Sequence, residues 1–393
     1  MEGEYEQSES KSGKTGQVHK WEDCSIMNSK MIRNKGKNQV IFHEASNPVW
    51  VKFISLSLKS GKCYYVVQCK HQITVFSFSI DIQTLIWRSF VESLRNSQLS
   101  QILKDNEPQT LFEEAANIIN DHYGAAAVDS ARNCFDLTVK LFHGNFRNYR
   151  KCNTEYHDVP HTVDVMLSAV RILDGYMLIH GKIDESLATQ LLMSALLHDA
   201  GYIQKKNDIT GTGAKYTFHH VERSMDFGRR HQKELFLTEA AADAVARIIK
   251  ATEFSIDFRT LSYASAEEKK VGAMLATADL IGQMADRMYL EKLLFLYYEF
   301  REAGVPGFDT EFDILRNTVN FYEVTSRRLD EQLGNIGRYA RLHFKKRHNI
   351  DENLYETAIE RNMVYLHKIM NDTTTNFRHK MKRGKFQEFR NNP

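Results

Sequence analysis

Apolar residues after residue 82 recur at the three- and four-residue spacing that is typical of amphipathic helices. This spacing predicts helices in the stretches Leu111 to Ile119, Ala126 to Phe142, Val163 to Ile179, Leu187 to Leu197, Ala240 to Ile249, Val271 to Phe300 and Ile314 to Leu333. Only five prolines occur in the chain, so long helices can form without interruption. We therefore expect a mainly α-helical domain over residues 106–370.

Short β-branched and aromatic runs replace the helical spacing between residues 38 and 82. The runs are residues 40–42, 49–54, 64–67 and 73–78, and turn-forming sequences separate some of them. This pattern predicts a small β-containing module over residues 39–105. Because no chemical motif occurs there, we interpret it as an accessory or dimerisation module, which would make the protein a homodimer.

Two polar segments flank these regions. Residues 1–38 are charged and lack periodicity, so we expect a disordered polar tail. Residues 371–393 contain the basic stretch Arg378–Arg390, which we interpret as a solvated basic tail rather than a binding site.

Composition excludes few classes of protein. The formal net charge of +2 does not favour a nucleic-acid or membrane partner. The five cysteines form no CxxC pair, which indicates reduced thiols in a cytoplasmic protein. The N-terminus lacks an apolar signal core, and no uncharged apolar run reaches the roughly 18 residues of a membrane helix. We expect a cytoplasmic protein without a membrane span.

The first group of residues with chemical potential is the segment Tyr156-His157-Asp158-Val159-Pro160-His161. Asp158 is a plausible helix N-cap, and Pro160 suits the first helical turn. His157 would then precede the helix and His161 would lie in its first turn, so both imidazoles could face one cleft. The pair alone leaves metal binding, catalysis and a structural role open, because capping and surface histidines are common.

The second group, His198 and Asp199, follows the almost wholly apolar stretch Leu187 to Leu197. We expect Gly201 to end this helix. Burying an imidazole beside a carboxylate costs free energy unless something compensates both groups, as a divalent cation would. A hydrogen-bonded pair is the alternative.

A third carboxylate, Asp279, interrupts a small apolar helix face. No Lys or Arg lies three or four residues away in either direction, so an ion-pair partner on the same helix is excluded. The compensating group must therefore come from elsewhere in the fold.

The order His…His-Asp…Asp on three separate helices resembles the HD superfamily of metal-dependent phosphohydrolases. Within that superfamily, the chain resembles the catalytic domains of class I 3′,5′-cyclic nucleotide phosphodiesterases. The matching segments are Asn148-Tyr149-Arg150, Tyr156-His157-Asp158-x-x-His161-x-x-Asp164, Phe218-His219-His220, Ala251-Thr252-Glu253 and Ala278-Asp279-Leu280. They follow the family's order over roughly half of the chain.

The resemblance implies an HD/phosphodiesterase-like all-helical fold with two divalent metal ions. The implied ligands of the first ion, Zn²⁺, Mn²⁺ or Fe²⁺, are His161, His198, Asp199 and Asp279. Asp199 would also bridge to a second ion, Mg²⁺ or Mn²⁺. Hydroxide between the ions would attack phosphorus, and His157 would protonate the departing 3′ oxygen. The small-molecule substrate would be a cyclic nucleotide. Implied substrate-contacting or supporting residues are Tyr156, Tyr202, His219, His220, Glu253, Thr318 and Phe321.

The chain departs from the family's pattern at three positions. Asp158 replaces an Asn, and Tyr202 replaces the last His of the motif His-Asp-x-x-His. Aligning residues 317–321 puts Thr318 at the base-recognition Gln and Phe321 at the stacking clamp. A phenol is a poorer ligand than imidazole, and a hydroxyl cannot make the two-point contact of an amide. The sequence therefore does not distinguish cAMP from cGMP.

Three alternatives remain open. One is an HD-domain phosphohydrolase that acts on another nucleotide or phosphate ester, because such sites are chemically general. Another is a di-iron oxygenase, which would need further histidines at the second metal, and His219 or His220 could supply only part of these. The third is an inactive sensor, which would be expected to have lost a ligand, whereas all four are present.

Overall fold

The computed structural model describes residues 107–372, 374 and 376–381, and the short segments 32–33, 40–41, 55–57, 63–69, 72–78 and 99–102. The chain divides into two compact units, residues 1–92 and 93–393. Apart from residues 32–33, the predicted disordered tail lies outside the described residues. The same is true of the predicted basic tail after residue 381.

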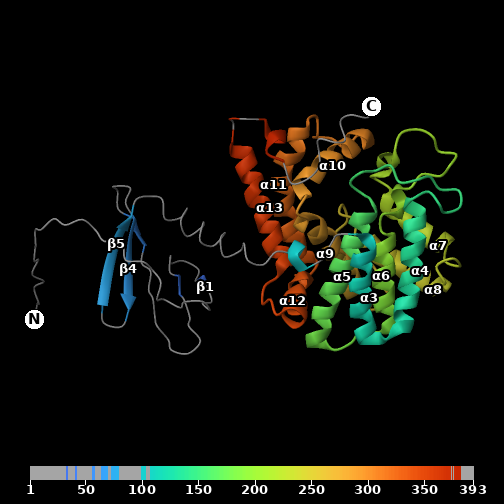
Figure 1. The fold of residues 1–393 in the computed structure, drawn as a ribbon, viewed down its shortest axis with the longest axis horizontal. Helices are drawn as coiled ribbons and strands as arrows, with labels where there is room; N and C mark the ends of the chain where they lie inside the picture. Colours follow the sequence, from blue (N-terminus) through green and yellow to red (C-terminus); the bar gives the residue numbers. More distant parts are fainter. Residues whose placement is uncertain are drawn as a thin grey trace, which may run out of the picture. The chain divides into compact units, whose positions relative to one another are not determined.

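The described strands of the first unit are all paired antiparallel (Figure 1). One pair consists of β1 (Ile32–Arg33) and β2 (Val40–Ile41). A three-stranded sheet has the order β3 (Ser55–Ser57), β4 (Cys63–Cys69), β5 (Gln72–Phe78). Strands β2, β4 and β5 overlap three predicted runs, whereas the run at residues 49–54 lies outside the described residues. The accessory or dimerisation role of this unit stays a prediction.

The second unit is helical, which confirms the predicted mainly α-helical class. Its α-helices are α2 (Leu99–Ile102), α3 (Pro108–Tyr123), α4 (Ala125–Phe142), α5 (Val159–His180), α6 (Glu185–Leu197), α7 (His220–Arg230), α8 (Glu239–Lys250), α9 (Ala266–Ala285), α10 (Tyr289–Ala303), α11 (Glu311–Arg327), α12 (Ala340–His348) and α13 (Leu354–Asn371). Short 3₁₀ turns are η1 (Ala200–Tyr202), η2 (Gly213–Tyr216), η3 (Phe258–Thr260), η5 (Ile336–Tyr339) and η6 (Phe377–His379). A π-helical turn, η4 (Arg328–Gln332), continues α11.

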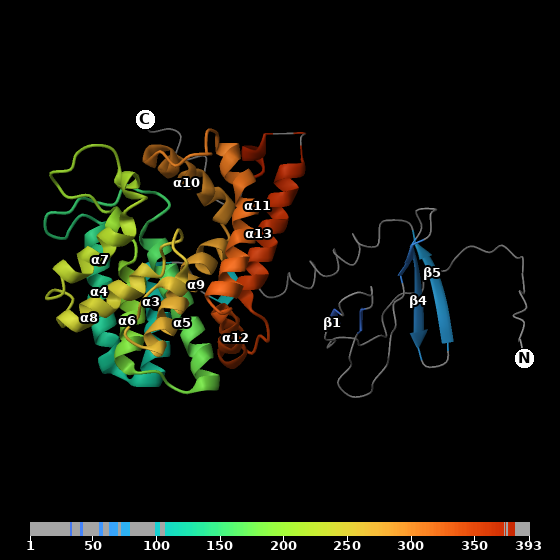
Figure 2. The same cartoon turned by 180° about the vertical axis from the view of Figure 1, so that it is seen from behind.

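Helix α5 forms the centre of the helical unit. It packs against α3, α6, α9 and α12, and Figures 1 and 2 show α3, α4, α5 and α6 side by side. Nearly every α5 residue from Val159 to Met177 is buried. A helix buried on all sides is apolar all round rather than striped. The start of α5, the end of α6 and the middle of α9 therefore lie close enough inside the core for their polar side chains to meet.

The stretch Val271 to Phe300 differs from its prediction, because it forms two helices instead of one. Asp286 leaves the helical conformation after α9, and its carboxylate pairs with Lys292 of α10 at 2.5 Å. Helix α7 was not predicted because its sequence is predominantly charged and polar.

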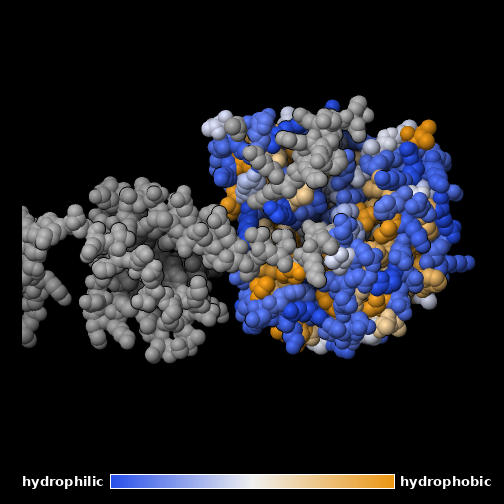
Figure 3. Space-filling model, in the orientation of Figure 1, coloured by the Kyte–Doolittle hydropathy of each residue, from blue (hydrophilic) through white to orange (hydrophobic). Residues whose placement is uncertain are grey.

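Polar residues cover much of one face of the helical unit (Figure 3). On the face shown in Figure 3, hydrophilic residues predominate and apolar residues are scattered among them. Among the described helices, none combines the length and apolar character needed to cross a membrane.

Candidate metal centre

The start of α5 positions the first group of candidate residues. Oδ1 of Asp158 accepts a hydrogen bond from the backbone nitrogen of His161 at 2.9 Å, and Pro160 lies in the first turn. The predicted N-cap is thereby confirmed. The cap fixes the first turn of the helix, so the side chain of His161 is buried in the core.

The end of α6 supplies His198 and Asp199, which are both buried. Nδ1 of His198 lies 2.7 Å from the carbonyl oxygen of Ala195. A carbonyl only accepts hydrogen bonds, so this nitrogen carries the hydrogen and Nε2 presents a lone pair. The backbone contact thus selects the tautomer that can bind a cation.

Gly201 has a different role from the predicted one. Helix α6 already ends at Leu197, and His198 caps it in an ordinary helical conformation, so no glycine stops it. A Cβ at position 201 would instead lie 2.0 Å from the carbonyl oxygen of His220. Glycine is needed here because the first turn of α7 approaches η1 closely, which brings His220 beside the candidate ligands.

Four side chains converge where α5, the end of α6 and α9 meet. Nε2 of His161 lies 3.3 Å from Oδ2 of Asp199 and 3.6 Å from Oδ1 of Asp279. Nε2 of His198 lies 3.2 Å and 3.7 Å from the same two oxygens. Ligands bound to one ion at about 2.1 Å lie roughly 3.0–3.4 Å apart, which is close to these separations.

Nε2 of His198 and Oδ2 of Asp199 are buried and have no hydrogen-bond partner within the described part of the chain. Two lone-pair-bearing atoms at this distance need a positive charge between them. The pKa of His198 reflects that need: burial is the largest single influence and lowers it, but the charges of Asp199 and Asp279 and the polar contacts with Asp199 and Ala195 together raise it to about 9. His161, His198 and Asp199 therefore form a group that could hold a divalent cation, and Oδ1 of Asp279 lies 3.6 Å and 3.7 Å from the two imidazoles.

The second carboxylate oxygen of Asp199 faces another histidine. Oδ1 lies 3.9 Å from Nε2 of His220, whose Nδ1 contacts the carbonyl oxygen of Thr217 at 2.7 Å. Nε2 of His220 consequently presents its lone pair on this side. Imidazole nitrogens therefore lie near both carboxylate oxygens of Asp199.

Tyr202, at the position where the resembled family has His, lies between two imidazoles. Its ring stacks on His157 with centroids 4.2 Å apart and on His220 with centroids 4.6 Å apart. The phenol is buried. Tyr202 therefore fills the gap between the two histidines and fixes their ring planes.

His157 is held by a residue that the sequence analysis missed. Its Nδ1 lies 2.6 Å from Oε2 of Glu299, and Oε1 of Glu299 accepts the backbone N–H of Tyr156 at 2.8 Å. Burial is the largest single influence on the pKa of His157 and lowers it, but the charge and hydrogen bond of Glu299, together with the charges of Asp199 and Asp279, raise the pKa overall. Glu299 lies between Tyr298 and Phe300 in an aromatic run of α10, and nothing in the sequence pairs it with His157.

A chain of hydrogen bonds also links Tyr156 to α9. The Tyr156 hydroxyl donates to the side-chain oxygen of Gln283, and Gln283 Nε2 donates to the carbonyl oxygen of Asp279 at 2.9 Å. Tyr156 therefore connects the segment before α5 to the helix turn that carries the third carboxylate.

Four other predicted residues are engaged elsewhere. His219 is exposed, and Glu253 accepts a hydrogen bond from Ser255 at 2.7 Å. Among the described residues, neither forms a hydrogen bond or ion pair with the four candidate ligands. Thr318 is buried, and its hydroxyl donates to the carbonyl oxygen of Ile314 within α11. Phe321 contacts Phe254, with ring centroids 5.3 Å apart.

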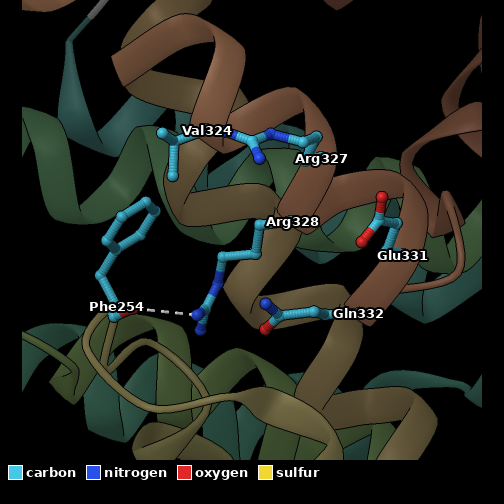
Figure 4. Close-up of a pocket in the computed structure, with 6 residues that line it drawn as sticks. All are labelled: Phe254, Val324, Arg327, Arg328, Glu331 and Gln332. Atoms are coloured by element: carbon cyan, nitrogen blue, oxygen red, sulfur yellow. Dashed lines mark hydrogen bonds between the residues drawn. The ribbon is translucent and has the colours of Figure 1, made fainter. Parts of the chain in front are cut away.

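Phe254 also lines a cavity of about 210 Å³ that contains none of the candidate ligands. Its lining residues are Phe254, Val324, Arg327, Arg328, Glu331 and Gln332 (Figure 4). The buried guanidinium of Arg328 donates to the carbonyl oxygens of Ala251, Glu253, Phe254 and Ile256. Arg328 therefore holds the loop after α8 against the π-helical end of α11.

Part of the chain matches a known protein family. Residues 204–336 match the model of a protein family described as Npun_R2479-like. The matched segment includes His220, Asp279 and Glu299, but not His157, His161 or the His198–Asp199 pair. A search of curated proteins found no match. The description of the matched family names no activity.

Proposed function

We propose that this protein is a metal-dependent phosphohydrolase that cleaves a phosphodiester, most specifically a 3′,5′-cyclic nucleotide to the 5′-monophosphate. One observation carries the proposal: Nε2 of His198 and Oδ2 of Asp199 face each other, buried and unpartnered, where His161 and Asp279 also converge. A structural hydrogen-bond network would leave neither atom unpaired. Two imidazoles and two carboxylates suit a borderline or hard divalent cation.

Divalent cations bound here would neutralise phosphoryl oxygens and lower the pKa of bound water. Asp199 is the residue that would hold two of them, because its Oδ2 lies near His198 and its Oδ1 lies on the side of His220. Zn²⁺, Mn²⁺ or Fe²⁺ would suit the first position, and Mg²⁺ or Mn²⁺ the second.

His157 would supply the proton to the leaving oxygen. Its Nδ1 is occupied by Glu299, so Nε2 remains available to the substrate. The carboxylate of Glu299 stabilises the imidazolium, and the raised pKa keeps a larger share of His157 protonated near neutral pH. Stacking on Tyr202 fixes the plane in which Nε2 can deliver that proton.

A second candidate is hydrolysis of another phosphate ester. The observation in its favour is that Thr318, aligned with the base-recognition residue, is buried and donates its hydroxyl to Ile314. A base edge would therefore gain no donor–acceptor pair from this position. Stacking on the Phe254–Phe321 pair would be left as the source of affinity for a base.

A substrate comparison with the purified full-length chain tests these proposals. The protein is stripped with a chelator, reloaded with Mn²⁺ alone or Zn²⁺ plus Mg²⁺, and assayed with cAMP, cGMP, bis(p-nitrophenyl) phosphate and p-nitrophenyl phosphate. We expect hydrolysis of the diesters and a ratio of kcat/KM for the two cyclic nucleotides within roughly 10–200-fold, the range that shape and stacking provide.

The variants His161→Ala and His219→Ala serve as the matched pair, since only the first removes a candidate ligand. Hydrolysis should be lost in His161→Ala and kept in His219→Ala. Hydrolysis of the monoester alone would favour the second candidate. If no ester is hydrolysed by the metal-loaded protein, the proposed function is wrong, and iron content with oxygen consumption would identify an oxygenase instead.

A further inference from the structure

A second group of ligating side chains lies outside the candidate metal centre, where α3 meets α12. Ligand atoms of Glu114, His343 and His348 all lie within 4.8 Å of one another. The two imidazole rings have centroids 5.6 Å apart. None of these residues belongs to the group at His161, and none was singled out by the sequence.

Asp174 of α5 fixes the tautomer of His343. Oδ2 of Asp174 lies 2.7 Å from Nδ1 of His343, and the guanidinium of Arg347 also binds Asp174, at 2.8 Å and 3.0 Å. Because a carboxylate paired with Arg347 accepts hydrogen bonds, Nδ1 of His343 carries the hydrogen. Nε2 is left with a lone pair directed away from Asp174.

That lone pair has no partner within the described part of the chain, although His343 is fully buried. A histidine that binds a metal commonly donates one ring N–H to a carboxylate and binds the ion through its other nitrogen. His343 has this arrangement, with Nδ1 on Asp174 and Nε2 unpartnered within the described residues.

Glu114 completes the group and gives it access from solvent. Nε and Nη2 of Arg171 both bind Oε1 of Glu114, at 2.9 Å and 2.7 Å, which leaves Oε2 for another partner. The side chain of Glu114 is 21% exposed, and His348 is half-buried. An ion could therefore reach the cluster from solvent past Glu114 and His348. Nε2 of the buried His343 would bind the ion on its protein side.

The surrounding charges permit a cation. Asp174 binds His343 and Arg171 binds Glu114, while Arg347 binds Asp174 and, further out, Asp121. The three carboxylates and two guanidinium groups together carry one net negative charge. The guanidinium of Arg171 weakens attraction for a cation, so the affinity should be lower than at a site with an unpaired Glu.

We propose that Glu114, His343 and His348 form a second metal site, selective for Zn²⁺ and similar cations, which ties α3 to α12. Two imidazoles and a carboxylate are a ligand set that Zn²⁺ takes in proteins, with a fourth position for water. Mg²⁺ and Ca²⁺, which prefer oxygen ligands, are disfavoured. The site is separate from the candidate catalytic centre, because Asp174 lies roughly 20 Å further along α5 than His161.

Zinc binding by the full chain tests the proposal. Protein stripped of metal is titrated with Zn²⁺ alone, and bound zinc per chain and the unfolding temperature Tm are measured. His348→Gln should bind one zinc ion fewer per chain than the wild type and show a smaller zinc-dependent rise in Tm. The control His219→Gln, an exposed histidine, should change neither quantity.

Two further variants, His161→Ala and Glu114→Gln, distinguish metal bound at this cluster from metal bound at the candidate catalytic centre. They also provide a test that does not depend on the folding of His348→Gln. In the His161→Ala background, which removes a ligand of the candidate catalytic centre, a His348-dependent zinc ion should remain. Co²⁺ bound to that variant should show the visible absorption bands of a low-symmetry site that has nitrogen ligands. Glu114→Gln should weaken these bands. Equal zinc content and equal Tm shifts in His348→Gln and His219→Gln would overturn the proposal, as would the absence of such bands from the His161→Ala protein.

Discussion

Glu299 holds His157 from a position 142 residues later in the chain, with 2.6 Å between Oε2 and Nδ1. Its other oxygen accepts the backbone N–H of Tyr156, so both oxygens bind the segment before α5. This two-point contact fixes the orientation of the imidazole and stabilises its protonated form. Glu299 is thus a positioning residue for the proposed proton donor.

Replacing Glu299 by Gln should alter the pH dependence of turnover. The charge of Glu299 raises the pKa of His157, so the uncharged amide should let that pKa fall. Loss of the protonated donor would then begin at lower pH, and the alkaline limb of the pH–rate profile should shift to lower pH. Bound metal should not change. An unshifted profile with a uniformly lower rate would point to a purely structural role.

Removing His157 should slow the reaction without releasing metal. We expect His157→Ala to reduce kcat by about 10²–10⁴-fold, the usual contribution of a positioned general acid. The loss should be smaller for a nitrophenyl ester, whose leaving group needs little protonation. Comparable losses for cyclic nucleotide and nitrophenyl substrates would contradict the assignment.

Asp279→Ala should abolish turnover and release the metal bound at the candidate metal centre. A methyl group cannot replace the carboxylate that faces His161 and His198 at 3.6 Å and 3.7 Å. Elemental analysis of the purified variant measures the release of metal, and the substrate comparison measures turnover. Asp257→Ala, which removes an Asp that forms an ion pair with nearby Arg259, is the matched control. Full metal content in Asp279→Ala would show that the ligand set is wrong.

The helical class and the N-cap at Asp158 could be predicted from the sequence, because both depend on local spacing and local hydrogen bonds. The sequence also identified four candidate ligands, His161, His198, Asp199 and Asp279, whose side chains lie close together in the fold. It missed Glu299, and it gave Gly201 the wrong role, because the partner of each lies far away in the chain. Contacts between distant helices depend on packing, which periodicity does not encode.

Gly201→Ala should destabilise the protein and disturb the site. The added Cβ would overlap the carbonyl of His220, a backbone atom that cannot move without α7. We expect a loss of about 1–3 kcal/mol in the free energy of unfolding, measured by urea denaturation. In the control Gly228→Ala, the Cβ meets only Val245 Cγ1 at 3.9 Å inside α7, so stability should be unchanged or rise by about 0.5–1 kcal/mol. Equal stability of the two variants would contradict the close approach.

The free energy of unfolding should fall as pH rises, because Asp164 ionises in the folded protein. Burial raises its pKa to about 7, and Asp286 adds to this effect while Lys292 opposes it. The unfolded chain has an Asp pKa near 3.8, so between that pH and about 7 the folded state binds more protons than the unfolded state. The stabilising contribution of the bound proton is complete below the unfolded pKa and is lost as pH rises through the folded pKa.

Urea denaturation of the wild type and Asp164→Asn at pH 5, 6, 7 and 8 measures this effect. The stability advantage of the Asn variant should grow with pH up to about 7 and then level off, because Asn does not ionise. A difference that stays constant over this range would show that Asp164 titrates normally in the folded protein.

The π-helical turn Arg328–Gln332 also affects how related sequences should be aligned. Its backbone bond runs from Leu333 to Arg328, so the turn accommodates one residue more than an α-helical turn. Deleting one residue there would restore a regular helix and leave the flanking segments in place, but it would withdraw Arg328 from the loop carbonyls that it binds. Homologues that lack this insertion should therefore show a single-residue gap between positions 328 and 332, together with loss of the arginine.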